Sequence, residues 1–217
     1  MMLNFILNLI YPNVCGFCNT INNNHLCKKC ELKLEKYKNT NIIDCSEINN
    51  KKFDYQINIF RYESIIREKL IQYKFNEKAY LFKTFSKIIL NDKKICGFFE
   101  KYDIIIPVPI HKKRNLQRGY NQTELIAREI AKNTNLILEN KVLIKQKNIK
   151  PQSGLTKFQR ENNIKNAFTA KNVNSIKNKN IILLDDIYTT GSTVNECCKV
   201  LKKLKVNKIA VLTIAKD

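Results

Sequence analysis

One stretch decides the fold of this chain: Ile181-Ile-Leu-Leu-Asp-Asp-Ile-Tyr-Thr-Thr-Gly-Ser-Thr193. Its four leading apolar residues indicate a strand that is buried on both faces of a parallel sheet. Asp185 and Asp186 then lie at the carboxyl end of that strand, where open α/β sheets bind their ligands. We expect a helix from about Ser192, preceded by a tight loop whose backbone N–H groups face an anion such as a phosphate. Gly191 lets the backbone approach that anion closely.

Two carboxylates beside a phosphate site are unusual unless the ligand carries hydroxyl groups or a cation between them. A ribose 5-phosphate meets this condition, with its hydroxyls on the aspartates and its phosphate on the loop. The stretch resembles the signature of type I phosphoribosyltransferases, which has four hydrophobic residues, two acidic residues and Thr-Gly-x-Thr, here Thr190 to Thr193. The alternative is a capped helix after a buried strand, with the aspartates as ordinary loop residues. Order, spacing and residue types together favour the sugar-phosphate site.

The cysteines near the start of the chain form two pairs with metal-ligand spacing, Cys15-x2-Cys18 and Cys27-x2-Cys30. Two such turns aim four thiolates at one centre, which suits a structural Zn²⁺, and we expect the metal to supply the folding energy of this short segment. His25 is a competing ligand that the four sulfurs make unnecessary. A disulfide pair and an iron–sulfur cluster stay open as competing interpretations, and the absence of a secretory signal favours a metal on reduced thiols. The isolated Cys45 is interpreted as a free thiol.

The 217 residues carry a net charge of +20, from 39 basic and 19 acidic side chains. This excess predicts a polyanionic partner, with nucleic acid the first candidate. Many lysines neighbour asparagine or isoleucine, so AT-rich coding is an alternative explanation. Residues 1–14 are apolar but interrupted by asparagines, which favours a short docking helix over a signal peptide or a membrane span. We therefore expect a cytoplasmic protein.

Three units are expected along the chain: an N-terminal helix and zinc ribbon (1–40), a linker (41–52) and a phosphoribosyltransferase-like domain (53–217). Apolar patterning predicts strands at 53–61, 103–108, 181–185 and 208–215, a short strand pair within 136–144, and helices over 31–38, 62–75, 77–99, 122–133 and 192–204. The basic segment after 103–108 is interpreted as a loop that is able to clamp a diphosphate. Residues 145–171 are interpreted as a long flexible loop or lid. The aromatic residues of the two central helices are interpreted as core.

Most of the chain resembles the ComF family, ComFC-like proteins that are tied to bacterial natural transformation. The resemblance rests on the cysteine ribbon, Phe60 to Glu63, Lys74-Phe75, Pro107 to His111 with Arg114, Arg118 to Gln122, the series Gln152, Leu155, Arg160, Asn163, Ala167 and Phe168, and Asp185 to Thr193. The chain departs from the family pattern at Lys147 and Ile149, where an Arg and a Thr are expected. Only Cys45 stands where many relatives carry a further cysteine pair, so we expect one metal.

The resemblance implies a type I phosphoribosyltransferase fold, a parallel sheet flanked by helices with a variable hood, and 5-phosphoribosyl 1-pyrophosphate (PRPP) with Mg²⁺ as ligand. Its implied contacts are the following: Asp185, Asp186, Thr189, Thr190, Gly191, Ser192 and Thr193 for the ribose and 5-phosphate; His111, Lys112, Lys113, Arg114 and Arg118 for the pyrophosphate; Gln152, Arg160 and Asn163 in the flexible loop. If a nucleophile displaces pyrophosphate, Asp185 and Asp186 are the candidate catalytic residues, with Asp186 in a proton-accepting or charge-stabilising role.

Three functions stay open. The first is a competence protein that handles incoming single-stranded DNA in the cytoplasm, with a competence helicase or other transformation proteins as candidate partners. The second is an active phosphoribosyltransferase whose acceptor is an unidentified base or other nucleophile. The third is a module that senses PRPP without chemistry.

Overall fold

The structure is a computed structural model that describes residues 12–75, 78–148 and 162–217. The predicted docking helix (1–14) lies almost wholly outside the described residues. So do Gln152, Ser153, Gly154, Leu155 and Arg160 of the predicted flexible loop. No helix in the described ranges combines the length and the apolar character that a bilayer crossing requires.

A six-stranded mixed sheet forms the centre of the fold, with strand order β1-β2-β8-β7-β3-β4. Its strands are β1 (Lys38–Asp44), β2 (Tyr55–Arg61), β3 (Ile104–Pro107), β4 (Ile137–Leu138), β7 (Ile181–Tyr188) and β8 (Ile209–Lys216). Every neighbouring pair is parallel except β1 with β2, which is antiparallel. The predicted parallel sheet flanked by helices is thus confirmed, with one antiparallel edge strand added.

Both faces of this sheet are covered, as the unbroken apolar runs predict. Along β7, Ile182 and Leu184 belong to one buried cluster, and Ile181 and Leu183 belong to the other. The helices are α2 (Lys28–Leu34), α3 (Ser64–Phe75), α4 (Leu81–Leu90), α5 (Lys93–Phe99), α6 (Lys112–Arg118), α7 (Gln122–Lys132) and α9 (Ser192–Lys202), with short 3₁₀ turns η1 (Glu35–Tyr37) and η2 (Val173–Ile176). The first cluster packs α3, α4, α5 and α7 on the sheet, and the second packs α9.

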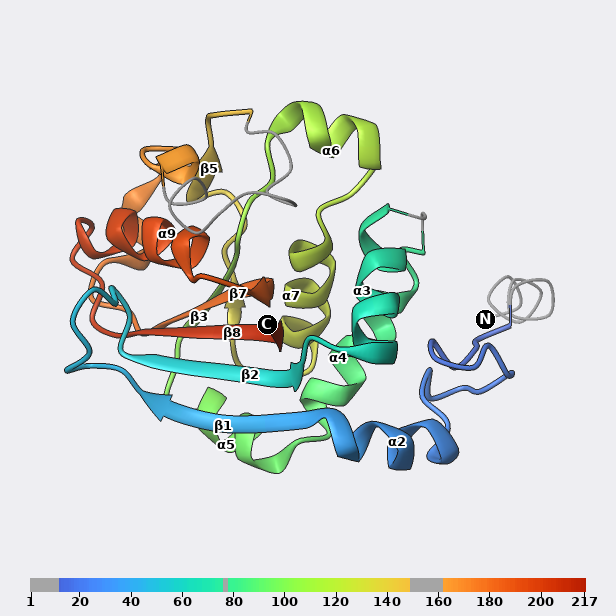
Figure 1. The fold of residues 1–217 in the computed structure, drawn as a ribbon. Coiled ribbons are helices and arrows are strands. Elements are labelled where there is room, and N and C mark those ends of the chain that lie inside the picture. The colour runs from blue at the N-terminus through green and yellow to red at the C-terminus, as the bar shows by residue number, and fades with distance from the viewer. Residues whose placement is uncertain (1–11, 76–77, 149–161) are drawn as a thin grey trace.

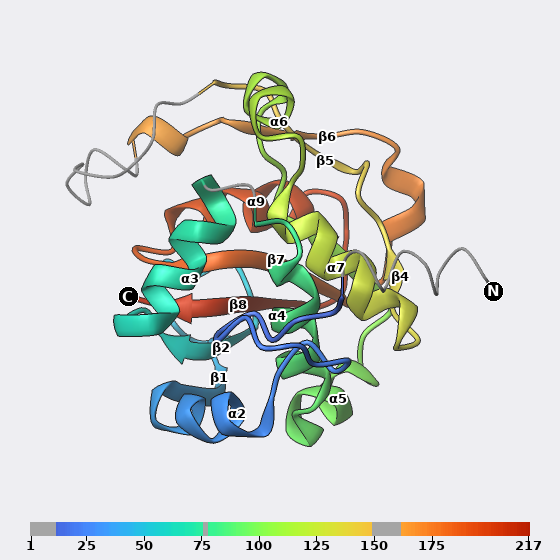
Figure 2. The ribbon, with the colours of Figure 1, turned by 90° about the vertical axis from the view of Figure 1, so that its right-hand side faces the viewer.

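A small hood stands over one end of the sheet. It consists of α6 and an antiparallel ribbon, β5 (Leu143–Lys145) with β6 (Phe168–Ala170). Both views place α6 and β5 together at the top of the molecule (Figures 1 and 2). The hood therefore brings residues from the middle of the chain above the end of β7.

The register of β7 explains why the sheet opens beside the paired aspartates. On one side β3 ends at Pro107, opposite Leu184, whereas on the other side β8 stays paired with β7 as far as Tyr188. The N–H of Val108 still donates to the carbonyl of Leu184 (2.9 Å), but the Val108 carbonyl accepts from Asn121 and Thr123, and the N–H of Asp186 donates to Asp185 Oδ1. The β3 edge of β7 is therefore unpaired from Asp185 onward. The strand is longer than the predicted 181–185, and its last residues border open space on one side.

Several predicted elements were wrong. The strand pair predicted within 136–144 does not form, because β4 pairs with β3 in the main sheet and β5 pairs with β6, which lies in the predicted loop 145–171. Part of the predicted linker (41–52) is β1, whose polar sequence hid an edge strand. The predicted helix over 77–99 is two helices, because Asp92 accepts hydrogen bonds from the backbone N–H groups of Lys94 (3.0 Å) and Ile95 (3.3 Å) and caps α5. The predicted basic loop forms helix α6, which ends at Gly119 with φ +80°. The helix predicted over 31–38 begins earlier, at Lys28, and continues as η1.

The start of α7 is tied to the end of β3. Asn121 occupies the N-cap position of α7, but its side chain makes no capping bond and donates to the carbonyl of Val108 (3.2 Å). Thr123 Oγ1 donates to the same carbonyl (2.8 Å). These two bonds hold the start of α7, which follows α6 of the hood, close to the end of β3.

Candidate functional site

A cleft of about 540 Å³ lies at the open end of β7, beneath the hood. Its volume falls in the range of small-molecule sites. The residues that line it come from α3, the β3–α6 connection, α6, α7, β5, β7 and the loop before α9: Tyr62, Arg67, Ile71, Lys74, Phe75, Val108, Pro109, Ile110, Arg114, Arg118, Asn121, Gln122, Thr123, Lys145, Asp185, Asp186, Ile187, Thr189, Thr193 and Asp217. Five of these side chains are basic and three are acidic, so the cleft attracts anions overall.

Asp185 lies buried at the floor of this cleft. Its Oδ1 atom accepts a hydrogen bond from the backbone N–H of Asp186 (2.9 Å). Burial, and next the adjacent Asp186 carboxylate, raise the pKa of Asp185 to about 7. A carboxyl group with this pKa exchanges its proton near neutral pH.

Asp186 is paired with a lysine that comes from a distant helix. Lys74 Nζ lies 2.8 Å from Asp186 Oδ2, and both side chains are largely shielded, with 23% and 15% of their surfaces exposed. The neighbouring Tyr73 is fully buried and donates its hydroxyl to the carbonyl of Gln122 (2.8 Å), which anchors the end of α3. Packing therefore holds this partly buried ion pair in place. Removing one partner from such a pair leaves the other charge uncompensated and destabilises the protein.

Three further cations face the carboxylates from the hood. Burial lowers the pKa of Lys145, and the charge of Arg114 lowers it further, while Asp185 opposes the shift. Burial and Arg114 also lower the pKa of Arg118, whose Nη1 donates to Gln122 Oε1 (2.7 Å). The charges of these groups interact across the cleft. Lys145 on β5 and Arg114 and Arg118 on α6 thus form a cationic roof over the acidic end of β7.

The loop between β7 and α9 has the geometry of an anion site. Gly191 caps α9 with φ +77°, and a Cβ atom there would overlap the ring and hydroxyl of Tyr188. Only glycine fits this left-handed, crowded position. The first backbone N–H groups of α9 have no partner within the helix. Thr189 and Thr193 line the cleft, which places this helix start at its edge.

The predicted site residues do not all meet in one place. Asp185, Asp186, Thr189, Thr193, Arg114 and Arg118 line the cleft. Thr190 and Ser192, whose hydroxyl groups lie 2.6 Å apart, line a second hollow of about 800 Å³. Lys112, Lys113 and Asn163 are exposed and are not among the residues that line the cleft. His111 caps α6 by accepting the N–H of Lys113 at Nδ1 (3.2 Å).

Sequence reasoning assigned no site role to three cations of the cleft, Arg67, Lys74 and Lys145. Lys74 carried a signal, because the Lys74-Phe75 pair formed part of the family resemblance. Lys145 carried none, because it is one lysine in a basic segment, and only the β5–β6 pairing turns it toward Asp185. All three positions depend on elements that are far from β7 in the chain.

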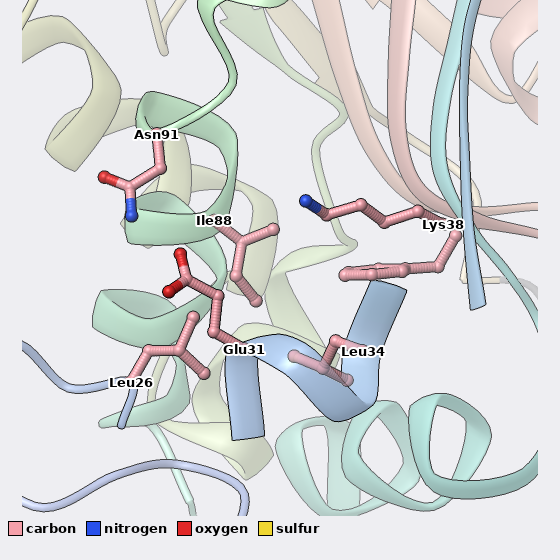
Figure 3. A pocket seen from close by; sticks show the side chains of 7 residues that line it. Leu26, Glu31, Leu34, Lys38, Ile88 and Asn91 are labelled. Carbon is pink, nitrogen blue, oxygen red and sulfur yellow. The ribbon is translucent and has the colours of Figure 1, made fainter. Parts of the chain in front are cut away.

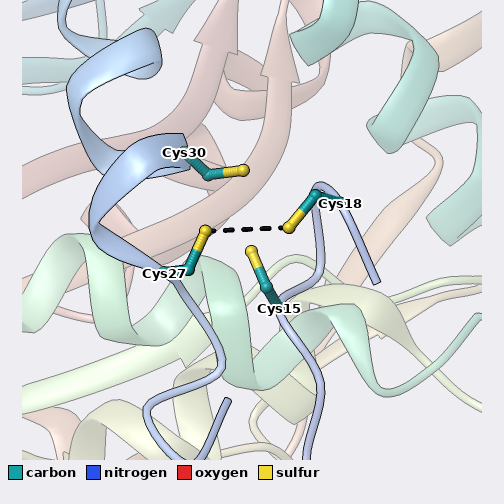
Figure 4. Close-up of side chains that lie close together, drawn as sticks. All are labelled: Cys15, Cys18, Cys27 and Cys30. Atoms are coloured by element: carbon teal, nitrogen blue, oxygen red, sulfur yellow. Dashed lines mark hydrogen bonds between the residues drawn. The ribbon is translucent and has the colours of Figure 1, made fainter. Parts of the chain in front are cut away.

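The four predicted metal ligands do converge. The Sγ atoms of Cys15, Cys18, Cys27 and Cys30 all lie within 4.8 Å of one another, and Figure 4 shows them pointing into one space. The cysteines are not joined as disulfides, and the Sγ atoms of Cys18 and Cys27 are 3.6 Å apart. Four sulfurs at about 2.3 Å from one ion have edges of about 3.8 Å. The cluster therefore fits a tetrahedral metal ion.

The ribbon that carries these cysteines packs on the body of the protein. Phe17 contacts Phe85 of α4 edge-on, with 6.3 Å between ring centroids, and Thr84 donates its hydroxyl to the carbonyl of His25 (2.9 Å). Cys15 and Cys30 are themselves buried in the core cluster that covers the helical face of the sheet. The metal site is thus coupled to the main fold by packing.

A small cavity marks the junction of the ribbon and the body (Figure 3). It lies between Leu26, the α2 residues Glu31 and Leu34, and the α4 residue Ile88, and its volume is about 60 Å³. Such a space holds only a few water molecules. It does not compete with the large cleft as a ligand site.

Comparison with known proteins identifies relatives of this chain. Residues 121–217 match the family described as phosphoribosyl transferase domain. The chain is 34% identical over 152 residues to competence protein F of Haemophilus influenzae, in an alignment that covers 68% of this chain and 66% of that protein. It is 28% identical over 217 residues to competence protein ComFC of Bacillus subtilis, which covers 97% and 81% respectively. It is 23% identical over 196 residues to the DNA utilization protein YhgH of Escherichia coli, which covers 87% and 83%.

Proposed function

Because the chain belongs to the ComF family of phosphoribosyltransferase-domain proteins, we propose that its cleft binds PRPP with Mg²⁺ and that the protein handles incoming single-stranded DNA in the cytoplasm. The observation that carries the first half is the juxtaposition of Asp185 and Asp186 with the start of α9 at the open edge of β7. Carboxylates that can hold ribose hydroxyls thus lie beside the N-terminus of a helix, whose first N–H groups can hold a phosphate.

The rest of the cleft supports the pyrophosphate end of this ligand. Arg114 and Arg118 on α6 and Lys145 on β5 form the cationic roof described above. Arginine pairs with phosphate oxygens through two parallel hydrogen bonds, and a shielded lysine adds a point charge. Bound Mg²⁺ would neutralise the phosphate charge, with Asp185 and Asp186 as the nearest protein oxygens for its shell.

Lys74 gives the pocket a built-in counter-ion. In this structure it neutralises Asp186 at 2.8 Å. A ligand that brings Mg²⁺ to the carboxylates must compete with this lysine, while a ligand phosphate gives the released ammonium a new partner. Lys74 therefore belongs to the proposed PRPP site, although it lies more than a hundred residues before β7.

The DNA half of the proposal rests on charge and on the relatives. The net charge is +20, and the similar proteins are named for competence and DNA utilization. A basic protein that neutralises several phosphates binds DNA with an affinity that falls steeply with salt. Candidate partners in this role are a competence helicase and other transformation proteins.

Zn²⁺ is the ion that we propose for the four-cysteine cluster, as a structural metal.

Transfer of phosphoribose to a base or another nucleophile is the second candidate function. One observation favours it: the pKa of Asp185, raised to about 7, suits a group that accepts a proton near neutral pH. Asp186 already pairs with Lys74, which makes Asp185 the better candidate for that step. Release of pyrophosphate from labelled PRPP across a panel of acceptors tests transfer, and binding without release with every acceptor contradicts it.

Calorimetric titration with PRPP and MgCl₂ tests the binding proposal. We expect Asp186→Asn and Lys74→Met to weaken PRPP binding at least about tenfold, because each removes a charged group that is shielded in the cleft. The matched control is Asp44→Asn, since Asp44 is exposed on the edge strand β1. PRPP binding that is equally tight in all four proteins would rule out this cleft as the site.

A further inference from the structure

Phe75 is much more exposed than the aromatic residues that α3 and α4 bury in the core. Tyr73 and Phe85 are 0% and 1% exposed and belong to the core, as the sequence predicts. Phe75, the last residue of α3, is 64% exposed and lines the cleft. Its exposed ring is therefore available to a ligand that enters the cleft.

One side of this ring meets a fixed guanidinium group. The Cζ atom of Arg118 lies 5.3 Å from the ring centroid of Phe75. Arg118 is held in place because Nη1 donates to Gln122 Oε1 at 2.7 Å, and Gln122 is 1% exposed. The pair joins the end of α3 to the end of α6, with the guanidinium over one face of the ring and most of the ring open to solvent.

Cations extend from this surface along the cleft. Arg67, Ile71 and Phe75 are spaced by four residues, so they lie on one face of α3, and all three line the cleft. Arg114 lies one turn before Arg118 on α6 and also lines it. Proteins bind single-stranded nucleic acid with aromatic rings on which bases stack and with cations that hold the phosphates, and here a ring with its guanidinium partner lines the same cleft as two further arginines.

We propose that Phe75 and Arg118 form a stacking platform for a base of single-stranded nucleic acid, and that Arg67 and Arg114 hold the adjoining phosphates. The platform rests on the proposed function, because it assigns to DNA a position at the mouth of the PRPP cleft. An acidic peptide could use the same arginines but has no base to stack. Bases, and not only negative charge, therefore contribute to affinity at this site.

A single-tryptophan variant tests the stacking directly. The natural chain contains no tryptophan, so Phe75→Trp places one reporter on the platform. We expect its fluorescence to be quenched on titration with a short thymidine oligomer and to change little with an abasic oligomer of the same length. Equal quenching by both oligomers would show contact with the backbone alone and would overturn the platform.

Affinity measurements give the second readout. Stacking of a base on an aromatic ring contributes about 1–3 kcal/mol, so Phe75→Ala should bind the thymidine oligomer about 5- to 150-fold more weakly, while Phe75→Trp retains affinity. Ile137→Ala is the matched control, because Ile137 is also 64% exposed but lies on β4. Unchanged oligomer affinity in Phe75→Ala would also overturn the platform.

PRPP titration separates failure of this inference from failure of the proposed function. Phe75→Ala should keep the PRPP affinity of the natural protein, which shows that the cleft is intact. If the natural protein binds the oligomer and Phe75→Ala binds it equally well, the platform fails and DNA handling stands. If the natural protein binds no oligomer, the DNA half of the proposed function fails together with the platform, whatever the PRPP result.

Discussion

The four-cysteine ribbon and the cleft at the end of β7 are built in opposite ways. The ribbon draws its four ligands from Cys15 to Cys30, and one tight turn and the first turn of α2 bring them together. The cleft draws on residues from Tyr62 to Asp217, carried by four helices, two strands and the loops between them. The first site takes all its ligands from one short segment, whereas the second exists only when the sheet and the hood are assembled.

This contrast extends to charge. Four thiolates repel one another, so a bound cation must hold the ribbon together. The cleft already contains opposite charges in contact, and the 2.8 Å pair of Lys74 with Asp186 is formed in the ligand-free protein. We therefore expect the ribbon to depend on its metal for structure, and the cleft to keep its shape without its ligand.

Removal of one thiolate should give the largest effect. Cys27→Ser leaves three sulfurs, and we expect metal content to fall from about one ion per chain to nearly none, with a marked loss of thermal stability, because structural Zn²⁺ contributes about 10–16 kcal/mol in small zinc domains. Metal analysis and thermal unfolding measure both changes. PRPP affinity should stay within about twofold if the cleft is independent of the ribbon.

Cys96→Ser is the matched control for this experiment. Cys96 lies on α5, outside the cluster, where its thiol donates to the carbonyl of Leu90 (3.2 Å). Its replacement should leave the metal content unchanged. A Cys27→Ser protein that keeps its metal would contradict the four-sulfur site, and one that loses PRPP binding would contradict the independence of the two regions.

The same contrast explains what could be predicted from the sequence. The cysteine spacing and the Ile181–Thr193 stretch are local, so both could be recognised in the sequence: the four cysteines converge, and Asp185, Asp186, Thr189 and Thr193 line the cleft. Lys145 could not be found this way, because its place in the cleft depends on β5 pairing with β6 more than twenty residues later. β1 was missed because an edge strand needs no continuous apolar run. Helix α6 was missed because a short basic segment with one exposed leucine, Leu116, has no buried face.

A pH series on Asp185→Asn should give the next largest effect, and it probes the cleft alone. An unfolded aspartate has a pKa of about 3.9, whereas burial raises the pKa of folded Asp185 to about 7. The folded protein therefore holds this proton more tightly than the unfolded chain. The stabilisation is complete below pH ~4 and is lost as pH rises to ~7. Since asparagine does not titrate, Asp185→Asn should gain stability relative to the natural protein over that range, by about 2–4 kcal/mol.

Chemical denaturation at pH 4.5, 6 and 8 measures this difference. Asp44→Asn is the control, since the backbone N–H of Ser46 lowers the pKa of Asp44 and makes the expected sign opposite. If the stability difference between Asp185→Asn and the natural protein does not change with pH, the carboxyl is not a desolvated acid. The cleft would then have to be far wetter than its burial indicates.

The smallest expected effect concerns the surface where the two regions meet. Gly16 lies in the ribbon against α4, where an added Cβ atom would overlap the hydroxyl of Thr84 and approach Leu81 Cδ2 to 2.8 Å. Overpacking of this kind costs about 1–3 kcal/mol, so Gly16→Ala should lower the unfolding temperature while metal content and PRPP affinity stay unchanged. Gly97→Ala on α5 is the matched control, because an added Cβ atom there meets no heavy atom within 4 Å, and alanine should stabilise that helix by about 0.5–1 kcal/mol. A Gly16→Ala protein that loses metal would show that packing of the ribbon on α4, and not only the cysteine spacing, shapes the four-sulfur site. The ribbon would then depend on the assembled fold much as the cleft does.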